Sequence, residues 1–437
     1  MDQAAPARFL DSHEAAATAP PFLVDARPAP PRRSRHAALL HRQLPPPRAG
    51  LRATVIIPAK DEAANLPATL AALAAQTDLA GRPLPVGSFE VIVLANNCTD
   101  ATLAVVRRQA QRFPHLVLHG AALCLPAAQA HVGRARRLLM DEACARLEQA
   151  GAPAGGVIAS TDADTRVAPT WLAATEAELA TGADAVGGRI FTAISGPTLA
   201  PLRRLQVRDA GYRLLCARLE DLLDPNPLDP WPRHHQHFGA SWALTARAHR
   251  RVGGLPPVRF LEDEALCQAL RRHDLRVRHS PHVQVFTSAR RQGRVEVGLS
   301  WQLREWLHMS RQQREPHVDS PVQLAALWLG RRQLRAYWTG RPALRDVPLA
   351  ARLGLPAAAL LARTRRAVTF GELWEWVLKT GRAARVASLP VSLALLELPL
   401  LIRHYERHGA EVAAAPYLAA FSASPASRAG SARVAAH

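Results

Sequence analysis

In VIASTDADT (residues 157–165), an apolar run leads directly into two carboxylates that stand one residue apart. The run 157–159 predicts a short buried strand that ends where the acids begin. Asp162 and Asp164 would then lie at the exposed end of that strand, where paired carboxylates offer hard oxygen ligands to Mg²⁺ or Mn²⁺. Such a metal is commonly shared with substrate phosphates, and the pattern therefore favours a nucleoside diphosphate site. An acidic loop that caps a helix is the structural alternative.

A similar segment lies upstream, in TVIIPAKDE (residues 54–62). Its β-branched start predicts a strand over 54–57 that Pro58 ends. Asp61 and Glu62 are expected to open a helix that runs to about Gln76, because acidic side chains in a first turn complement the helix dipole. Polar residues would thus follow this strand as well.

A third segment, FEVIVLANNCTD (residues 89–100), predicts a strand and then a polar turn that carries Asn97 and Asp100. Strands and helices thus alternate through the first half of the chain, which is typical of an α/β protein with a doubly wound, mostly parallel sheet. Ligands of such sheets bind at the carboxyl ends of the strands. The polar residues at all three strand ends are therefore expected to meet in one site.

These three segments and LEDEAL (residues 261–266) resemble four motifs of family 2 glycosyltransferases with the GT-A fold. The resemblance covers about residues 52–294. It implies a GT-A sheet, a nucleotide-diphospho-sugar donor, an acceptor hydroxyl and a divalent metal, Mn²⁺ or Mg²⁺. It also implies inversion at the transferred sugar. Asn96 and Asn97 depart from the pattern, since many relatives carry acids there that grip the nucleotide base.

The resemblance also assigns roles to individual residues. Asp263 is expected to be the catalytic base with Glu262 in support, and N-capping of the helix that starts there is the structural alternative. The expected metal ligands are Asp162, Asp164 and His282, although His282 also fits an ordinary strand. The expected contacts with the nucleotide-sugar are Pro58, Asp61, Glu62, Asn97, Asp100, Arg134, Arg136, Asp162, Arg291 and Arg294.

Two groups of arginines provide the basic part of that site. Arg134 and Arg136 lie at a predicted helix start and can bind a diphosphate through charge-assisted pairs, unless they form a solvated helix face. Arg291 and Arg294 flank a glycine after the predicted strand 283–288. There they would neutralise the leaving diphosphate.

The segment HHQH (residues 234–237) invites a zinc site. Adjacent side chains rarely converge on one tetrahedral metal, however, and no Cys or Asp is spaced to complete the set. A polar acceptor loop is the favoured interpretation, because the following FGASWAL (residues 238–244) resembles the acceptor-side segment of the family.

Two other classes of function remain open. A catalytically silent GT-A scaffold that binds nucleotide-sugars is expected to lack Asp162, Asp164 or Asp263, and all three are present. A nucleotidyltransferase usually has a glycine-rich phosphate loop, and PAKDE (residues 58–62) contains no glycine. The Gln-x-x-Arg-Trp motif of the processive synthases is missing, which argues against a polysaccharide synthase.

The chain of 437 residues has a formal net charge of +19. Only two of its 55 basic residues are lysines, so part of the charge reflects a compositional bias toward arginine. The rest indicates a preference for anions such as nucleotide diphosphates or a phosphate-rich membrane surface. Nucleic acid is not expected as a partner, because no nucleic-acid fold signature is present and acids cluster at the predicted site.

Five widely spaced cysteines without a zinc or disulfide pattern, and an amino-terminal segment without an apolar core, predict a cytoplasmic protein. Four parts are predicted: an irregular Pro/Ala/Arg-rich leader (1–50), a GT-A domain (51–306), a helical C-terminal region (307–421) and a frayed tail (422–437).

No apolar run in the C-terminal region reaches membrane-spanning length without a charge or a proline. The run 386–402 comes nearest. It fits either a buried helical segment or an amphipathic surface that gives the protein peripheral contact with a membrane.

Overall fold

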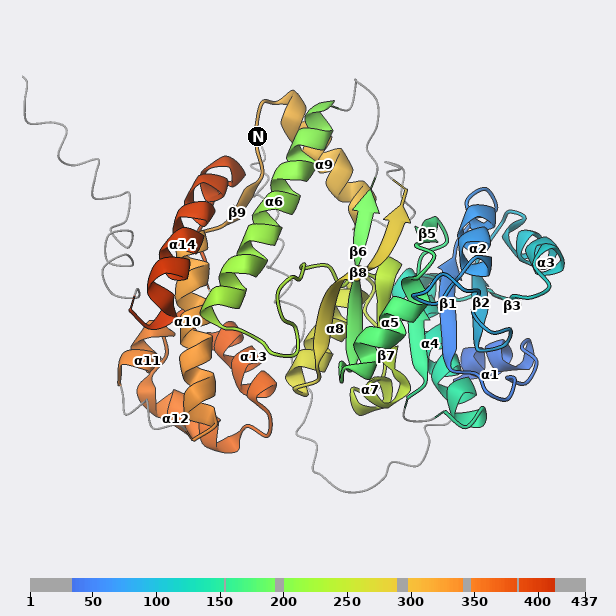
Figure 1. Ribbon diagram of the computed structural model, residues 1–437, viewed down its shortest axis with the longest axis horizontal. Coiled ribbons are helices and arrows are strands. Elements are labelled where there is room, and N and C mark those ends of the chain that lie inside the picture. The colour runs from blue at the N-terminus through green and yellow to red at the C-terminus, as the bar shows by residue number, and fades with distance from the viewer. Residues whose placement is uncertain are drawn as a thin grey trace, which may run out of the picture.

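The computed structural model describes residues 34–152, 155–192, 200–288, 298–340, 347–382 and 385–412. An eight-stranded sheet lies at the centre of one half of the molecule (Figure 1). Its strands are β1 (Ala53–Ala59), β2 (Phe89–Asn96), β3 (Val117–Leu123), β4 (Val157–Ser160), β5 (Thr165–Val167), β6 (Ala185–Thr192), β7 (Trp242–Thr245) and β8 (Val277–Thr287).

The strand order is β3-β2-β1-β4-β7-β6-β8-β5. β7 runs antiparallel to both of its neighbours, β5 runs antiparallel to β8, and the remaining pairs are parallel. The predicted α/β fold with a mostly parallel sheet is confirmed. The loops after β1, β2 and β4 therefore leave the sheet at the same edge.

The sequence predicts that β1 ends before Pro58, but the strand continues to Ala59. β1 pairs with β2 over its whole length, whereas its pairing with β4 ends at Ile56. Beyond Ile56 the strand has one ladder partner only. A proline is tolerated in such a position, as it is on an edge strand, because fewer backbone N–H groups are needed.

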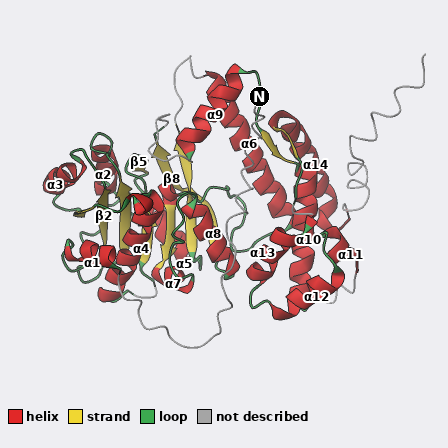
Figure 2. Cartoon of the chain, turned by 180° about the vertical axis from the view of Figure 1, so that it is seen from behind, coloured by secondary structure: helices red, strands yellow, loops and turns green. Residues whose placement is uncertain are grey.

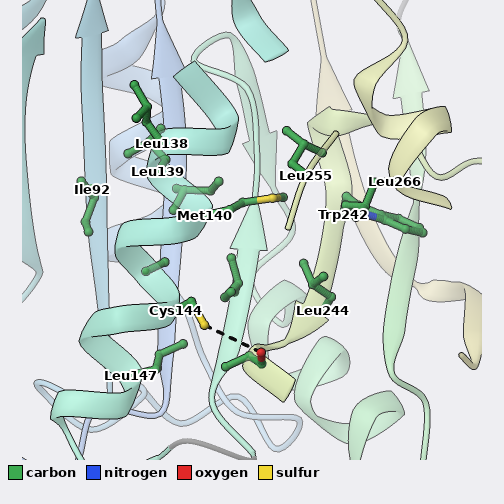
Figure 3. Packing of buried hydrophobic residues seen from close by; sticks show 14 of the residues in the cluster. Ile92, Leu138, Leu139, Met140, Cys144, Leu147, Trp242, Leu244, Leu255 and Leu266 are labelled. Carbon is green, nitrogen blue, oxygen red and sulfur yellow. Dashed lines mark hydrogen bonds between the residues drawn. The ribbon is translucent and has the colours of Figure 1, made fainter. Parts of the chain in front are cut away.

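Alternate residues of β1 face two separate cores. Ile56 belongs to one core, and Val55 and Ile57 belong to the core on the opposite face. Figure 3 shows Leu139 of α4 and Trp242 of β7, which belong to the same core as Ile56. This alternation explains why the central strands are apolar throughout, since both of their faces are covered. Helix α4 (Val132–Gln149) contributes most of the helical residues of the first core, and α1 (Arg35–Arg42), α7 (Ala246–Arg251) and α8 (Glu262–Arg272) add to it. Helices α2 (Leu66–Ala74), α3 (Thr102–Arg112) and α5 (Trp171–Ala180) contribute to the second.

The predicted irregular leader contains one helix in its described part. Residues 35–42 form helix α1 (Arg35–Arg42), which begins where Ser34 accepts a hydrogen bond from Ala37 N. Leu40 is fully buried in the core beneath α4, and Nδ1 of His41 lies 2.8 Å from Oε1 of Glu142 on α4. The short Ala/Leu run inside a proline-rich segment thus supplies an apolar face to the domain. Residues 1–33 lie outside the described residues.

A buried carboxylate, Glu90 of β2, ties the sheet to α4. Arg146 donates two hydrogen bonds to it, at 2.7 and 2.6 Å, and Thr54 donates a third at 3.0 Å. Nε2 of His119 lies 3.3 Å from the same carboxylate. Burial alone would raise the pKa of Glu90, but Arg146 and His119 lower it to about 2. Glu90 is therefore ionised at neutral pH although its side chain is 1% exposed.

Arg146→Met is expected to destabilise the protein by roughly 3–5 kcal/mol, because the charge of Glu90 would remain buried without its main partner. Urea unfolding at neutral pH measures this loss. The matched double variant Glu90→Gln/Arg146→Met removes both charges and should recover a large part of the stability. Equal instability of the single and double variants would show that the stranded charge is not the cause.

The predicted helical C-terminal region is present, but it does not form a separate unit after residue 306. Tyr212, Leu219 and Leu223 of α6 share one core with residues of α10 and α14. Figure 2 shows these helices gathered beside the sheet. The helices are α6 (Ala200–Leu223), α9 (Leu299–Arg311), α10 (Pro321–Trp338), α11 (Val347–Arg352), α12 (Ala357–Arg366), α13 (Phe370–Thr380) and α14 (Val391–Val412), with β9 (His317–Asp319) paired to β10 (Ser388–Pro390). Within the described residues, no helix combines the length and the apolar character that crossing a membrane requires.

Helix α13 contacts the C-terminal end of α8 (Glu262–Arg272). Arg272 donates to Glu375 at 2.7 Å, and the carboxylate of Asp274 accepts bonds from Phe370 N and Gly371 N at 2.8 and 2.7 Å. A Cβ added at Gly371 would lie 1.8 Å from the carbonyl oxygen of Arg271, so only glycine fits this contact. The helical region therefore holds one end of α8.

Candidate active site

The loop after β1 is joined to the loop after β2 by the carboxylate of Asp61. Asp61 has a left-handed backbone conformation with a φ of 51°, and its Oδ1 accepts bonds from Thr99 N at 2.6 Å and Asp100 N at 3.3 Å. The bond from Thr99 is the largest cause that lowers the pKa of Asp61 to about 2. The predicted helix does not begin at Asp61 but at Leu66, because the intervening residues form this loop.

Asn97 holds the chain that follows β3. Its side-chain Nδ2 donates to Leu125 O and its Oδ1 accepts from Leu125 N, both at 2.9 Å. The carboxylate of Asp100 is engaged in the same way, with bonds from Thr102 N at 2.9 Å and Ala63 N at 3.0 Å. The amide at position 97, where the family pattern has an acid, therefore has a structural task in this chain.

Arg136 of α4 crosses the carboxyl end of β4 and joins two of the predicted acids. Its Nη2 donates to Oδ1 of Asp162 at 2.7 Å, its Nη1 donates to Oε1 of Glu262, and its Nε donates to Oγ of Ser160 at 3.1 Å. Burial alone would lower the pKa of Arg136, but Glu262 and Asp162 raise it. Arg136 thus lies at the predicted site, with its guanidinium directed to carboxylates and 3% of the residue exposed.

Asp162 and Asp164 lie in the turn between β4 and β5, as predicted. Both residues are partly exposed, and 38% of the Asp162 side chain is accessible. Two carboxylates at the accessible end of a strand form a hard oxygen donor set. This set fits Mn²⁺ or Mg²⁺, provided that diphosphate oxygens complete the coordination shell.

Another group of possible ligands, Asp61, Cys98 and Asp100, places three ligand atoms within 4.8 Å of one another. Sγ of Cys98 lies 3.2 Å from Asp61 N, which donates to it, and donates to Ala59 O at 3.4 Å. Both aspartates accept backbone hydrogen bonds. Loop architecture accounts for this cluster.

Gly239 is the point at which three parts of the site meet. Its N donates to Oδ2 of Asp263 at 3.0 Å, and its carbonyl accepts from Oγ of Ser160 at 3.1 Å. A Cβ at this position would lie 2.4 Å from Nη2 of Arg136. The absence of a side chain at position 239 therefore allows the predicted acceptor segment to lie against Arg136, between the end of β4 and the start of α8.

Three consecutive acids open α8 and have different partners. Glu262 is 5% exposed and pairs with Arg136, and burial raises its pKa. Asp263 accepts from Gly239 N and, through Oδ1, from Glu264 N at 2.8 Å. Glu264 lies with Oε2 2.6 Å from Nε2 of His237. Asp263 is the acid of this motif that is bound directly to the acceptor segment.

Behind Glu264, a line of buried side chains runs into the protein. Nδ1 of His237 lies 3.3 Å from Nε2 of His279, and Nδ1 of His279 lies 2.8 Å from Oδ2 of Asp229. His234 and His237 are 3% and 9% exposed. The prediction of a polar acceptor loop over residues 234–237 is therefore wrong for these two histidines. His237 lies between Glu264 of α8 and His279 of β8, and Nε2 of His234 lies 3.0 Å from Ser280 O of β8.

The charges along this line differ. Burial alone would lower the pKa of His237, but Cys267 and Glu264 raise it to about 10. Burial would raise the pKa of Glu264, but His237 lowers it to about 2. Burial lowers the pKa of His279. His237 and Glu264 therefore form an ion pair at neutral pH, next to a neutral His279.

Because the pKa of His237 is raised in the folded state, its ion pair stabilises the protein fully below the unfolded pKa of about 6.5. That stability is lost as the pH rises toward about 10. His237→Gln should therefore flatten the fall in melting temperature between these pH values. Thermal unfolding across this range measures the slope, with His282→Gln as a control that removes an exposed histidine. Parallel curves for the wild type and His237→Gln would contradict the assignment.

Several predicted residues lie elsewhere. Thr287 of β8 pairs with Thr165 beside Asp164, whereas His282 lies five residues earlier, within a register irregularity of β8. Among the described residues, Asp162, Asp164 and His282 do not bring three ligand atoms within 4.8 Å of one another. The structure therefore does not bring His282 to the aspartates. Nη2 of Arg134 lies 3.4 Å from Oγ of Ser34.

The remaining predicted contacts divide into two groups. Pro58 is in β1, and Glu62 is 5% exposed, with its Oε2 accepting from Asn65 at 2.7 Å and its N donating to Thr102 at 2.9 Å. Both lie in or just after β1. Arg291 and Arg294 lie outside the described residues.

A cavity of about 350 Å³ lies away from these acids. It is lined by residues that include Gln76, Phe89 and His115, and Phe89 is the first residue of β2. The cavity is therefore near the amino ends of the parallel strands, whereas the acids lie at their carboxyl ends.

Comparison with known protein families finds a match for part of this arrangement. Residues 54–230 match the model of the family described as Glycosyl transferase family 2. This segment is therefore a glycosyl transferase family 2 domain. The match contains Asp61, Asn97, Asp162 and Asp164, and it ends before the acids of α8. No curated protein matches the sequence.

Solved glycosyltransferase structures show a distant likeness to this chain. A mannosyltransferase from Pyrobaculum calidifontis, in complex with GDP-Man and Mn²⁺, is 21% identical, with a TM-score of 0.39 and coverage of 77% of this chain and 88% of that one. S. aureus TarS 1-349 with UDP-GlcNAc is 15% identical, with a TM-score of 0.40 and coverage of 76% and 91%. Glucosyl-3-phosphoglycerate synthase from M. tuberculosis is 18% identical, with a TM-score of 0.34 and coverage of 65% and 88%.

Proposed function

We propose that this family 2 glycosyltransferase moves a sugar from a nucleotide-diphospho-sugar to an acceptor hydroxyl, with inversion and with the help of a divalent metal. The observation that carries the proposal is the position of Arg136, which pairs with both Asp162 and Glu262. The predicted metal acids and the predicted base motif are far apart in the sequence, and this arginine places them at one site.

Asp162 and Asp164 would hold Mn²⁺ or Mg²⁺, which supplies charge neutralisation for the diphosphate of the donor. Arg136 orients Asp162, because its guanidinium donates to one carboxylate oxygen and is itself fixed by Ser160 and Glu262. We therefore assign Arg136 to positioning. Arg134, Arg291 and Arg294 remain our candidates for direct contact with the diphosphate.

Asp263 is the base in this proposal. Glu262 is buried against Arg136, and Glu264 is paired with His237, so each of these carboxylates is committed to a cation. The contacts of Asp263 are with backbone N–H groups, including that of Gly239 in the acceptor segment. An acceptor hydroxyl bound beside Gly239 would lie within reach of a carboxylate that is held in place and can accept its proton.

The donor base would lie over the loops after β1 and β2. Asp61 and Asn97 shape this surface through their bonds to Thr99 and Leu125. Because Nδ2 and Oδ1 of Asn97 each already bind the backbone of Leu125, one N–H and one lone pair of that amide are left for recognition of the base. This is a specific point at which the proposed site differs from the acidic pattern of the family.

Asp164→Asn should abolish Mn²⁺-dependent binding of a nucleoside diphosphate while the protein remains folded. The reason is that the amide removes one of two negative charges from the proposed metal ligands. Calorimetric titration of nucleoside diphosphate with Mn²⁺, and again with EDTA, measures the effect. Asp221→Asn on α6 removes the same charge elsewhere and should bind normally. Unchanged, EDTA-insensitive affinity of Asp164→Asn would refute the metal assignment.

Asp263→Asn should bind the donor almost as the wild type does but transfer sugar more slowly, by about 10²–10⁴-fold, since a general base acts mainly in the transition state. Donor screening with Mn²⁺ would first identify the nucleotide-sugar, and turnover would then be followed by release of the nucleoside diphosphate. Glu262→Gln and Glu264→Gln serve as neighbouring controls.

The outcomes separate the alternatives. If Glu264→Gln loses transfer activity while Asp263→Asn keeps it, the assignment of Asp263 as the base is wrong. Release of pyrophosphate instead of nucleoside diphosphate would identify a nucleotidyltransferase. Binding of the donor without any turnover, with every hydroxyl acceptor class and with water, would support a catalytically silent scaffold.

A further inference from the structure

Helix α14 carries an exposed apolar stripe on one face. Leu393, Leu396 and Leu400 are 50%, 68% and 50% exposed, and their spacings of three and four residues place them on one side of the helix. Arg403 and Arg407 continue the same spacing and are also exposed. The face therefore consists of three leucines followed by two arginines.

The opposite face of α14 is the one that belongs to the core. Leu398 and Leu401 are buried with Tyr212 and Leu219 of α6. Figures 1 and 2 both place α14 on the side of the helical region that is remote from the sheet. One face of this segment is therefore packed, and the other exposes leucines, so the membrane-contact alternative stays a prediction.

The charge around the stripe favours an anionic partner. Glu406 pairs with Arg218 at 2.9 Å. Glu397 lies six residues before Arg403, beyond the spacing of three or four residues at which side chains pair along a helix. The arginines at the end of the stripe are therefore not balanced by these two acids. The whole chain is also strongly basic, with a formal net charge of +19.

We propose that this face of α14 docks the protein on a lipid bilayer that contains anionic headgroups. The three leucines would enter the boundary between headgroups and acyl chains, and Arg403 and Arg407 would pair with lipid phosphates. The helix would lie in the plane of the interface in this arrangement.

A second copy of the chain fits the stripe less well. A stable protein interface usually buries about 800 Å² on each partner, and three half-exposed leucines supply only a small part of such an area. Two copies in a parallel arrangement would also place the arginines of one stripe against those of the other, where like charges repel. An anionic bilayer avoids both difficulties, because its acyl chains can take up the leucines and its headgroups carry negative charge for the arginines.

The experiment uses the full chain and sedimented vesicles of phosphatidylcholine with about a third phosphatidylglycerol, at low salt. We expect the wild type to co-sediment with these vesicles at low salt. High salt should release it, and vesicles of phosphatidylcholine alone should not bind it. Leu393→Gln/Leu396→Gln/Leu400→Gln should weaken binding roughly tenfold or more, because the apolar contact is removed. Arg403→Gln/Arg407→Gln should weaken it by roughly tenfold on the anionic vesicles.

Two matched controls test whether the position of the change matters. Leu79→Gln/Val86→Gln removes two exposed apolar side chains from the sheet domain, and Arg107→Gln/Arg108→Gln removes two exposed arginines from α3. Both should bind vesicles as the wild type does. Since the stripe is remote from the acids of the site, all variants should match the wild type in nucleotide binding. The vesicle result therefore tests this proposal separately from the glycosyl transfer proposal.

Three results would overturn the proposal. The wild type could remain in the supernatant with anionic vesicles at low salt. The leucine and arginine variants could bind as strongly as the wild type, which would place membrane contact elsewhere. The leucine variant could instead convert a stable dimer of the wild type into a monomer in analytical ultracentrifugation without any vesicle binding, which would identify the face as a contact between copies.

Discussion

The buried guanidinium of Arg136 is the interaction on which the site depends. It is bound to Asp162 at the end of β4, to Glu262 at the start of α8 and to Ser160, and Gly239 leaves the space that it occupies. A buried cation of this kind is tolerated only when its partners repay the loss of hydration. The three partners therefore also restrain each other, and loops that come from distant parts of the chain are held in one geometry.

The same principle recurs twice around the sheet with different chemistry. Glu90 is a buried anion held by Arg146, and His237 is a buried cation held by Glu264. Each pair links a helix to a neighbouring element, α4 to β2 in one instance and α8 to residue 237 in the other. Buried ion pairs add little net stability but are costly to break. They are thus well suited to fixing the relative positions of elements.

Much of this arrangement could be predicted from the sequence, because it follows from local patterns. Apolar runs that end in polar residues indicated β1, β2 and β4 and the edge at which Asp61, Asn97 and Asp162 lie. The partners of those residues could not be predicted. Asn97 binds Leu125, and Arg136 reaches Glu262, through contacts between segments that sequence spacing does not relate. The buried histidines were missed for a similar reason, since a run of polar residues normally indicates a surface loop and only the packing of α8 against β8 covers them.

The contact between α13 and α8 changes what counts as a complete catalytic unit. A shortened protein that ends near residue 306 would retain every acid of the site, yet Leu219 and Leu223 of α6 would lose the apolar partners that bury them. The far end of α8 would also lose Gly371 and Glu375, against which it rests. Trimming the chain to its family motifs would thus be expected to yield an aggregating fragment, and a minimal soluble enzyme has to be sought by altering the surface of the helical region while its core is kept.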